Sequence, residues 1–573
     1  MLPDLDSTQR RQLLWLFAIA FLVLAAGFGL RDPWPADEPR FVLVAKQMVD
    51  GGSWWFPHRG HELYPDKPPL YFWLLALSHA LTGSWRWSFL LPSLVSGMAV
   101  LWLVYDLGRR LWDHRSGLWS AIAVLCCLQF VYQFKRAQID PSLVLATTLS
   151  LYGLLRHLLC GPEWRWYFIG CVMAGVGVVL KGVGFLPLLI LLPYALLRRR
   201  GWQGLAAIAP GQGRRWSLGA LLFLLPIAAW LLPMISMALA GGDPEHRAYL
   251  DNLLFKQTAT RYADAWHHHK PAWYFLEVIA LFWLPFSLAL AWIWKDWRSA
   301  WRERDARVWL PLLWSALVLL FFSASPGKRD MYILPILPAV ALAAGPYLGN
   351  LMNRASFRRV LWLFAFALSA ALLALGIAAL QSPPRFVADL MVDRGLLAAD
   401  AQALWWMLVA VGGIGLLATL FGRLTGAARA VAVLLVALWC GYGFVAHPVL
   451  DASSSARALM QQARVVAGPG TEIGLVEWKE QNLLQAVGPT EEFGYRVPAP
   501  EQMRRAAAWL EQAPDRRRLL FSQPRAKPPC FAASELGTQA VRPVGSANRR
   551  DWFLVSRAGL ATRCFSQGLD VPD

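Results

Sequence analysis

Residues 31–86 read RDPWPADEPRFVLVAKQMVDGGSWWFPHRGHELYPDKPPLYFWLLALSHALTGSWR. They follow an apolar run, Leu13–Leu30, that is long enough to cross a bilayer. The segment itself carries six acidic and six basic side chains, so it cannot lie in hydrocarbon. Loops of this length are uncommon between neighbouring helices unless they have a function. We therefore expect residues 31–86 to form half of a functional site at a membrane surface.

The composition is that of an integral membrane protein. Of the 573 residues, 57% are hydrophobic, whereas soluble domains average about 45–50%. The net charge is +18, but the chain from His447 onward holds 16 Lys and Arg against 13 Asp and Glu, so most of the excess accompanies the apolar segments. Basic loops on one side of a membrane and attraction to anionic lipids explain this distribution. Membrane lipids, and not nucleic acid, are therefore the expected partners of this charge.

Uncharged apolar runs of about 20 residues predict about 13 transmembrane helices. They lie near 13–30, 88–107, 118–134, 142–159, 167–180, 183–197, 217–240, 273–294, 309–325, 331–348, 360–380, 404–421 and 430–447. The first run is longer than the core of a cleaved signal peptide, so we expect it to remain as a helix. Only Lys181 and Gly182 separate the runs 167–180 and 183–197, which favours a tight hairpin. The predicted fold is a mainly α-helical polytopic membrane domain over residues 1–447.

The loops with the most Lys and Arg predict the orientation. These are 108–117, 198–216, 295–308, 349–359 and 422–429. They fall on one side of the predicted bundle, which the positive-inside rule assigns to the cytoplasm together with the N-terminus. The periplasmic side then receives 31–86, 135–141, 241–272, 326–330, 381–403 and the tail from 448. We expect chemistry on this periplasmic face.

Residues 448–573 predict a small separate domain. Helical periodicity at 453–466 and 501–512 alternates with strand-like runs at 471–478, 518–521 and 552–555. This pattern is typical of an α/β domain, which the predicted orientation makes periplasmic. Cys530 and Cys564 would then have the chance to form a disulfide, which the sequence leaves open.

Two charged motifs stand out in the first loop. Residues 37–40 read Asp-Glu-Pro-Arg and come about seven residues after the first span. A carboxylate near apolar surface can act as a base, although ordinary loop charge is the alternative. Residues 66–69 read Asp-Lys-Pro-Pro and precede Leu70–Leu81, which is too short to span and is interpreted as an interfacial helix. Lys67 would either hold a phosphate or extend to the membrane surface.

Charged residues also occur in short turns of the same face. Asp140 begins a predicted helix, where capping its N-terminus is the simpler interpretation. Lys181 lies in the predicted hairpin, and Lys328, Arg329 and Tyr332 lie in a later turn. Several basic residues on the side that the positive-inside rule leaves poor in them indicate an anionic ligand, such as a lipid phosphate.

The loop 241–272 holds a run of three histidines at 267–269. Three consecutive histidines cannot all face one metal ion in regular structure. One or two of them, with a carboxylate from another loop, would suit a divalent ion, and surface polar residues are the alternative.

In this order along the chain, the motifs resemble those of the GT-C membrane glycosyltransferases of the protein O-mannosyltransferase type. They are most similar to those of the bacterial lipid A aminoarabinose transferases. The resemblance covers about residues 10–460 and implies a GT-C fold in a bacterial inner membrane. It also implies a sugar donor on undecaprenyl phosphate, with 4-amino-4-deoxy-L-arabinose as the sugar, and lipid A or a related periplasmic acceptor.

The resemblance implies roles for single residues as well. Asp37 matches the catalytic acid of the first loop, and Lys67 and Asp140 match further catalytic positions. Contacts to the donor and its phosphate are implied for Glu38, Arg40, Lys181, Arg261, Lys328, Arg329 and Tyr332. Asp66 with His267 and His268 would form a site for a divalent metal ion, the one cofactor that the family suggests. Pro39 before Arg40, and Asp in place of Glu at position 66, leave the acceptor open.

Two other functions remain as alternatives. An O-mannosyltransferase-like enzyme would share the loop chemistry and use a protein or another glycan as acceptor. A transporter or flippase of a lipid-linked sugar would need polar groups at the bilayer midplane and internal repeats. The charges of this chain lie at the ends of the predicted spans, which favours a transferase.

Overall fold

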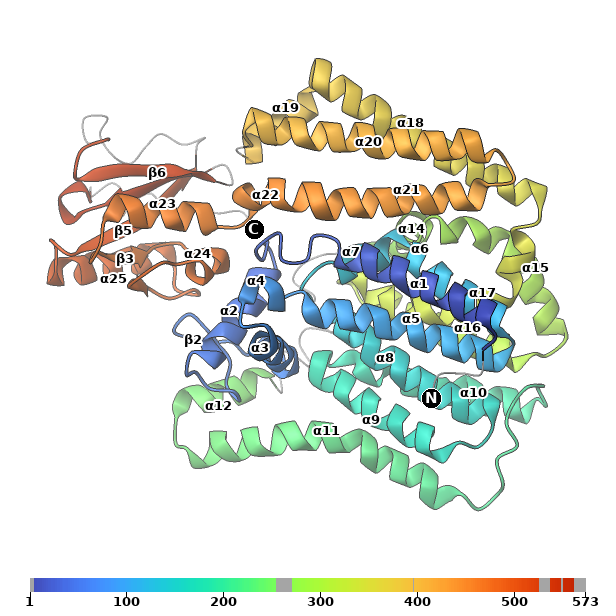
Figure 1. The fold of residues 1–573 in the computed structure, drawn as a ribbon. Coiled ribbons are helices and arrows are strands. Elements are labelled where there is room, and N and C mark those ends of the chain that lie inside the picture. The colour runs from blue at the N-terminus through green and yellow to red at the C-terminus, as the bar shows by residue number, and fades with distance from the viewer. Residues whose placement is uncertain (1–4, 254–269, 395, 525–535, 548–549, 561–573) are drawn as a thin grey trace.

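The computed structural model describes residues 5–253, 270–394, 396–524, 536–547 and 550–560. Long helices form a bundle, and a small α/β unit adjoins one end of it (Figure 1). The bundle helices are α1 (Ser7–Ala25), α5 (Leu91–Leu111), α6 (His114–Cys126), α7 (Leu128–Phe134), α8 (Ile139–Leu155), α9 (Trp164–Lys181), α10 (Leu191–Arg199), α11 (Gly213–Ala240), α14 (Tyr274–Phe282), α15 (Phe286–Arg302), α16 (Ala306–Ala324), α17 (Leu337–Leu351), α18 (Ala355–Gln381), α20 (Ala398–Gly422), α21 (Ala427–Gly441) and α22 (His447–Ser454).

Shorter elements connect these helices. Two 3₁₀ segments, η2 (Val183–Ile190) and η4 (Asp330–Ile336), and two π segments, η1 (Arg156–Cys160) and η5 (Tyr442–Ala446), adjoin bundle helices. The first loop contains α2 (Glu38–Val49), β1 (His58–Arg59), β2 (Glu62–Leu63), α3 (Leu70–Thr82) and α4 (Trp85–Ser88). The helices α12 (Pro244–Asp251) and α19 (Arg385–Arg394) lie in two later connections. The helix predicted at 70–81 is confirmed as α3.

The chain is a multi-pass membrane protein, but the predicted count of about 13 spans is not confirmed. Among the described residues, eight helices have the length and apolarity of a membrane span, and counting each of two sharply bent pairs as a span brings the number to ten. The helix α1 carries Arg10 and Arg11 in its first turns and ends at Ala25, which leaves a short apolar part. The run 183–197 divides into η2 and α10, and neither is long enough to cross alone.

The hairpin predicted around Lys181 is present, and glycine makes it possible. At the end of α9 the chain turns at Gly182 and returns as η2, which packs against α9. A Cβ atom on Gly184 would lie 1.9 Å from the carbonyl carbon of Gly177, so only glycine permits this approach of the two backbones. The tight packing fixes Lys181 at the end of the bundle.

The tail forms the predicted α/β unit. Its sheet has five strands in the order β4-β3-β5-β7-β6. They are β3 (Glu472–Leu475), β4 (Thr490–Glu492), β5 (Arg517–Pro524), β6 (Val541–Ala547) and β7 (Arg550–Val555), with helices α23 (Arg457–Ala467), α24 (Glu480–Leu484) and α25 (Ala499–Gln512). Strand β3 pairs in parallel with β4 and β5, whereas β7 pairs antiparallel with β5 and β6. The unit lies at the end of the bundle where α2 and α3 are found (Figure 1).

Candidate active site

The start of α2 separates two neighbouring carboxylates. Asp37 is the residue before the helix and Glu38 is its first residue, with Pro39 in the first turn. Proline favours this position because its fixed φ suits a helix and its missing N–H would have no partner there. The Asp37 side chain is 18% exposed, whereas that of Glu38 is 1% exposed. The two acids therefore meet different surroundings although they adjoin in sequence.

Glu38 is held by protein groups on both of its oxygens. Its Oε2 accepts hydrogen bonds from Arg31 Nη1 at 2.5 Å and from the backbone N–H of Trp34 at 2.8 Å. Its Oε1 accepts from Arg31 Nη2 at 2.7 Å and from the backbone N–H of Ala137 at 2.9 Å. Arg31 also donates to the carbonyl of Lys135 at 3.2 Å. Glu38 therefore links the first loop to the turn before Asp140 through hydrogen bonds. Because both of its oxygens are occupied, this geometry argues against the contact with the sugar donor that the sequence predicted.

Asp37 has looser contacts with two cations. Its Oδ1 lies 3.7 Å from Arg40 Nη1, and its Oδ2 lies 4.0 Å from Arg329 Nη1. Arg40 comes from α2, and Arg329 directly precedes η4, nearly 300 residues later in the chain. Neither distance is that of a hydrogen bond. The Asp37 carboxylate is thus beside positive charge without being locked into an ion pair.

Arg40 has a closer partner in the tail. Its Nε donates to Glu480 Oε1 at 2.7 Å, and Arg59 Nη1 donates to the same oxygen at 3.3 Å. The guanidinium of Arg59 in turn covers the ring of Tyr495 at 3.4 Å from its centroid. Burial lowers the pKa of Arg40, but the charge of Glu480 and the hydrogen bond to it, with contributions from the Tyr64 hydroxyl and from Asp37, outweigh this and raise the pKa above its ordinary value. Arg40 is therefore a permanent cation beside Asp37.

The second acid, Asp140, forms an ion pair with Lys181. Lys181 Nζ lies 2.7 Å from Asp140 Oδ1, and the same ammonium lies 5.1 Å from the ring centroid of Tyr332. Asp140 is in the first turn of α8, and the residue that caps α8 is Gln138, so the capping interpretation of Asp140 is wrong. The predicted meeting of α8, the Lys181 hairpin and the turn at Tyr332 is therefore present.

Tyr71 of α3 is near enough to Glu38 and to Asp140 for both charges to act on its hydroxyl. Its side chain is fully buried. Burial raises the pKa of Tyr71, and the nearby charges of Glu38 and Asp140 raise it further. The helix α3 contacts both α2, which begins at Glu38, and α9, which ends at Lys181.

Other predicted residues have protein partners of their own. Lys328 is buried and donates to the backbone carbonyls of Ser325 at 2.6 Å and Lys270 at 3.1 Å. It therefore holds the turn that carries Arg329. Asp66 accepts a hydrogen bond from Arg496 Nη2 of the tail at 3.2 Å. Lys67 is partly buried and follows Asp66 directly at the start of α3.

The expected metal site lacks support in the described part of the chain. Its two histidines, His267 and His268, lie outside the described residues, as does Arg261. Within the described ranges, no three His, Cys, Asp or Glu side chains gather closely enough to hold an ion. Asp66, the third expected ligand, is paired with an arginine. We derive no step of the chemistry through a metal ion.

The sequence did not predict several residues of this site, among them Arg31, Glu480 and Arg496. In the sequence Arg31 is one of six basic residues of the first loop, and the tail shows only the periodicity of helices and strands around Glu480 and Arg496. The pattern Lys-Glu at 479–480, at the start of a short helix after a strand, gives no signal that it reaches the first loop. Contacts between residues more than 400 positions apart need the structure.

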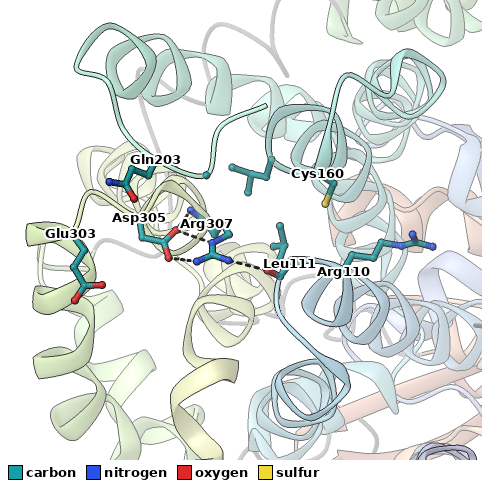
Figure 2. A pocket seen from close by; sticks show the side chains of 9 residues that line it. Arg110, Leu111, Cys160, Gln203, Glu303, Asp305 and Arg307 are labelled. Carbon is teal, nitrogen blue, oxygen red and sulfur yellow. Dashed lines mark hydrogen bonds and ion pairs between the residues drawn. The ribbon is translucent and has the colours of Figure 1, made fainter. Parts of the chain in front are cut away.

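A cavity of about 480 Å³ lies elsewhere, among the loops predicted as cytoplasmic (Figure 2). Its lining includes Arg110 at the end of α5, Cys160 at the end of η1, and Asp305 and Arg307 around the start of α16. Asp305 and Arg307 hold each other through two side-chain hydrogen bonds. The helix α5 begins beside the first loop and runs for 21 residues, about 30 Å, to this cavity. The cavity is therefore separate from the site around Asp37.

Known proteins match both the sequence and the fold. Residues 66–232 match the family described as dolichyl-phosphate-mannose-protein mannosyltransferase. An undecaprenyl phosphate-alpha-4-amino-4-deoxy-L-arabinose arabinosyl transferase of Pseudomonas aeruginosa is 33% identical over 343 residues, 58% of this chain and 58% of that protein. A transferase of the same name (number 1) from Pseudomonas fluorescens is 31% identical over 344 residues, again 58% of each. The alignments thus cover little more than half of these relatives' length.

The structural matches extend further along the chain. The crystal structure of ArnT from Cupriavidus metallidurans bound to undecaprenyl phosphate has a TM-score of 0.68 at 18% identity, over 96% of this chain and 98% of that one. The Archaeoglobus fulgidus oligosaccharyltransferase in the apo form has a TM-score of 0.51 at 13% identity, over 89% of this chain and 69% of that one. In sequence over part of its length, and in fold over most of it, this chain is similar to the undecaprenyl phosphate-aminoarabinose transferases, and the resemblance expected from its motifs is confirmed.

Proposed function

We propose that the chain transfers 4-amino-4-deoxy-L-arabinose from undecaprenyl phosphate to lipid A, or to a related acceptor, at the periplasmic face of a bacterial inner membrane. One observation carries the proposal: acids and cations from separate turns meet at one end of the bundle. Asp37, Arg40 and Arg329 form one group, and Asp140, Lys181 and Tyr332 form the other. The named activity of the curated relatives agrees with this chemistry.

The orientation belongs to the same proposal. The N-terminus is cytoplasmic, the site around Asp37 is periplasmic, and residues 448–573 form a periplasmic domain that adjoins it. The positive-inside rule supports this, because basic residues gather at the end of α5 that is farther from the first loop: Arg307 donates to the carbonyl of Leu111 there, and Arg304 donates to that of Arg200. The tail bonds to the first loop through Glu480 and Arg496, which supports a common side of the membrane for both.

The reaction breaks the bond between the sugar carbon C1 and the phosphate oxygen, which leaves with its electron pair as undecaprenyl phosphate. Lys67, Lys181 and Arg329 stabilise the negative charge that develops on that oxygen. The acceptor oxygen attacks C1 from the opposite face, so the configuration inverts. Asp37 takes the proton of a hydroxyl acceptor, or orients the sugar if the acceptor is already a phosphate anion.

Two predicted donor contacts receive other roles in this mechanism. Glu38 and Lys328 are buried and bonded to protein groups, so they support Asp37 and Arg329 without touching the donor. The loop residue Arg261 remains a proposed phosphate contact, as its sequence position suggests.

A reconstituted assay tests the function. The purified chain in vesicles receives undecaprenyl phosphate-aminoarabinose and lipid A, and mass spectrometry follows the mass gain of lipid A. Modified lipid A supports the proposal. Transfer only to an added protein or another glycan would replace it with the O-mannosyltransferase-like alternative, which the match of residues 66–232 favours. Donor that crosses the vesicle membrane without any transfer would point to a flippase.

A further inference from the structure

The tail controls the geometry of a cation beside the proposed base. Arg40 lies between two acids: Glu480 Oε1 is 2.7 Å from its Nε, and Asp37 Oδ1 is 3.7 Å from its Nη1. The nearer acid is not on the bundle but on α24 of the tail. The Glu480 side chain is 5% exposed, so water screens its charge little. Arg40 is therefore held by the tail more closely than by Asp37.

Glu480 is itself fixed in place. Arg59 of the first loop donates to the same Oε1 at 3.3 Å and stacks on Tyr495 of the tail. The helix α24 begins with the side chain of Asn482 bonded back to the backbone N–H of Lys479, which orders its first turn. A buried carboxylate with two guanidinium partners has little freedom to move. The position of Arg40 thus depends on how the tail packs against the first loop.

Removing the negative charge of Glu480 would lower the basicity of Asp37. Arg40 would lose its closest anion, and the nearest remaining one is Asp37, within about 1 Å of hydrogen-bond distance. A guanidinium that closes on a carboxylate makes it a weaker base, because an opposite charge favours the ionised form. The loss of the negative charge of Glu480 itself also makes Asp37 a weaker base, because one repelling anion fewer favours its ionised form. Arg329 also faces Asp37, and the titratable hydroxyl of Tyr64, which burial keeps neutral by raising its pKa, faces Arg40.

We propose that Glu480 is a positioning residue of the tail that holds Arg40 away from Asp37 and so keeps Asp37 able to accept a proton. The inference rests on the proposed function, in which Asp37 is the base. It assigns the tail a part in catalysis without contact to the sugar or the phosphate. Nothing in the reaction passes through Glu480, since it acts only through Arg40.

The test is the variant Glu480→Gln, which keeps the shape and removes the charge. We expect kcat to fall about three- to tenfold, with the acidic limb of the pH–rate profile about 0.5–1 unit lower. Binding of undecaprenyl phosphate should not change. Glu501→Gln is the matched control, because Glu501 is a tail residue paired with Arg504 and Arg505 at the surface. A Glu480→Gln enzyme with unchanged kcat and pH profile would overturn the inference.

A double variant separates positioning from general damage. If Glu480 acts through Arg40, then Glu480→Gln in an Arg40→Met background should change nothing further, whereas independent effects would multiply. Glu480→Asp keeps the charge and should give a smaller change of the same sign, which tests the inference if Glu480→Gln does not fold.

A structure of Glu480→Gln tests the geometry without any activity. The distance from Arg40 Nη1 to Asp37 Oδ1 should shorten from 3.7 Å to that of a hydrogen bond. An unchanged distance contradicts the inference and leaves the proposed function intact. If the wild-type chain transfers no sugar while the distance shortens, the proposed function fails and the positional part of the inference stands.

Discussion

Asp37 and Glu38 are neighbours in sequence and opposites in the structure. Glu38 accepts four hydrogen bonds at 2.5–2.9 Å, and two of its donors are backbone N–H groups that cannot turn away. Asp37 has two guanidinium neighbours at 3.7 and 4.0 Å and remains partly exposed. One carboxylate fastens the first loop to the bundle, and the other, the proposed base, has only these longer contacts with the two guanidinium groups.

The difference shows how the chain combines a rigid frame with a reactive acid. A catalytic base has to be positioned accurately, and a tight ion pair with a cation would lower its basicity. Glu38 provides the position, because it adjoins Asp37 and bonds to the turn three residues before Asp140. Asp37 can then lie in looser surroundings. Each of the following changes tests one side of this division.

The largest change in the free energy of unfolding is expected at Glu38, which is buried and fully bonded. Glu38→Ala leaves Arg31 buried without its partner and two backbone N–H groups without an acceptor, so the free energy of unfolding should fall by about 3–5 kcal/mol. Denaturation of the detergent-solubilised protein measures it. A loss under about 1 kcal/mol would mean that the buried pair does not hold the loop, and the contrast with Asp37 would disappear.

Asp37→Asn should lower the rate of sugar transfer and leave the free energy of unfolding nearly unchanged, the reverse of the emphasis at Glu38. The variant keeps nearly the same shape and loses only the proton-accepting charge, so kcat for sugar transfer should fall about 100-fold or more. The free energy of unfolding should stay within about 0.5 kcal/mol of the wild type, because the carboxylate is partly exposed and loosely paired. The rate of lipid A mass gain and a denaturation curve check the two halves. Intact transfer by this variant would remove Asp37 from the mechanism.

Lys181 tests the cations that face the donor phosphate. Lys181→Met removes the ammonium and leaves Asp140 without its partner, so undecaprenyl phosphate should bind about 10- to 100-fold more weakly. Binding to vesicle-embedded protein measures this without turnover. The double variant Lys181→Met with Asp140→Asn removes the stranded acid and should recover stability but not binding. Wild-type affinity in the single variant would exclude Lys181 from the donor site.

The sequence predicted which charged residues lie on one face of the bundle. It did not predict that Asp37 and Glu38 would have different surroundings there. Apolar runs and basic loops predicted that Asp37, Asp140, Lys181 and Arg329 share one face, and the structure brings them together in two groups, each with an acid beside a cation. The roles of Asp37 and Glu38 depend on which side of the first helical turn each one faces. The sequence Asp-Glu does not show which of the two carboxylates is buried and which stays partly exposed.

The tail shows the second limit of prediction. Its strands and helices follow from alternating and helical periodicity, and β3, β5, β7, α23 and α25 lie close to the predicted runs. The contact of Glu480 with Arg40 joins residues 440 positions apart. Such a contact depends on how two folded units pack, and one sequence does not contain that information in a readable pattern.

The smallest effect is expected at the other end of α2, which makes it a control for the first variant. Lys46 and Asp50 form an ion pair one turn apart, and both side chains are exposed, at 37% and 53%. Water solvates these charges in the folded chain as well as in the unfolded one, so Lys46→Ala should change the free energy of unfolding by less than about 0.5 kcal/mol. The same denaturation experiment measures it, now on an ion pair of the same helix that differs from Arg31–Glu38 in burial. If Lys46→Ala cost as much as Glu38→Ala, the effect at Glu38 would come from disturbing α2 in general, and burial would no longer explain why one acid of the first loop fastens and the other reacts.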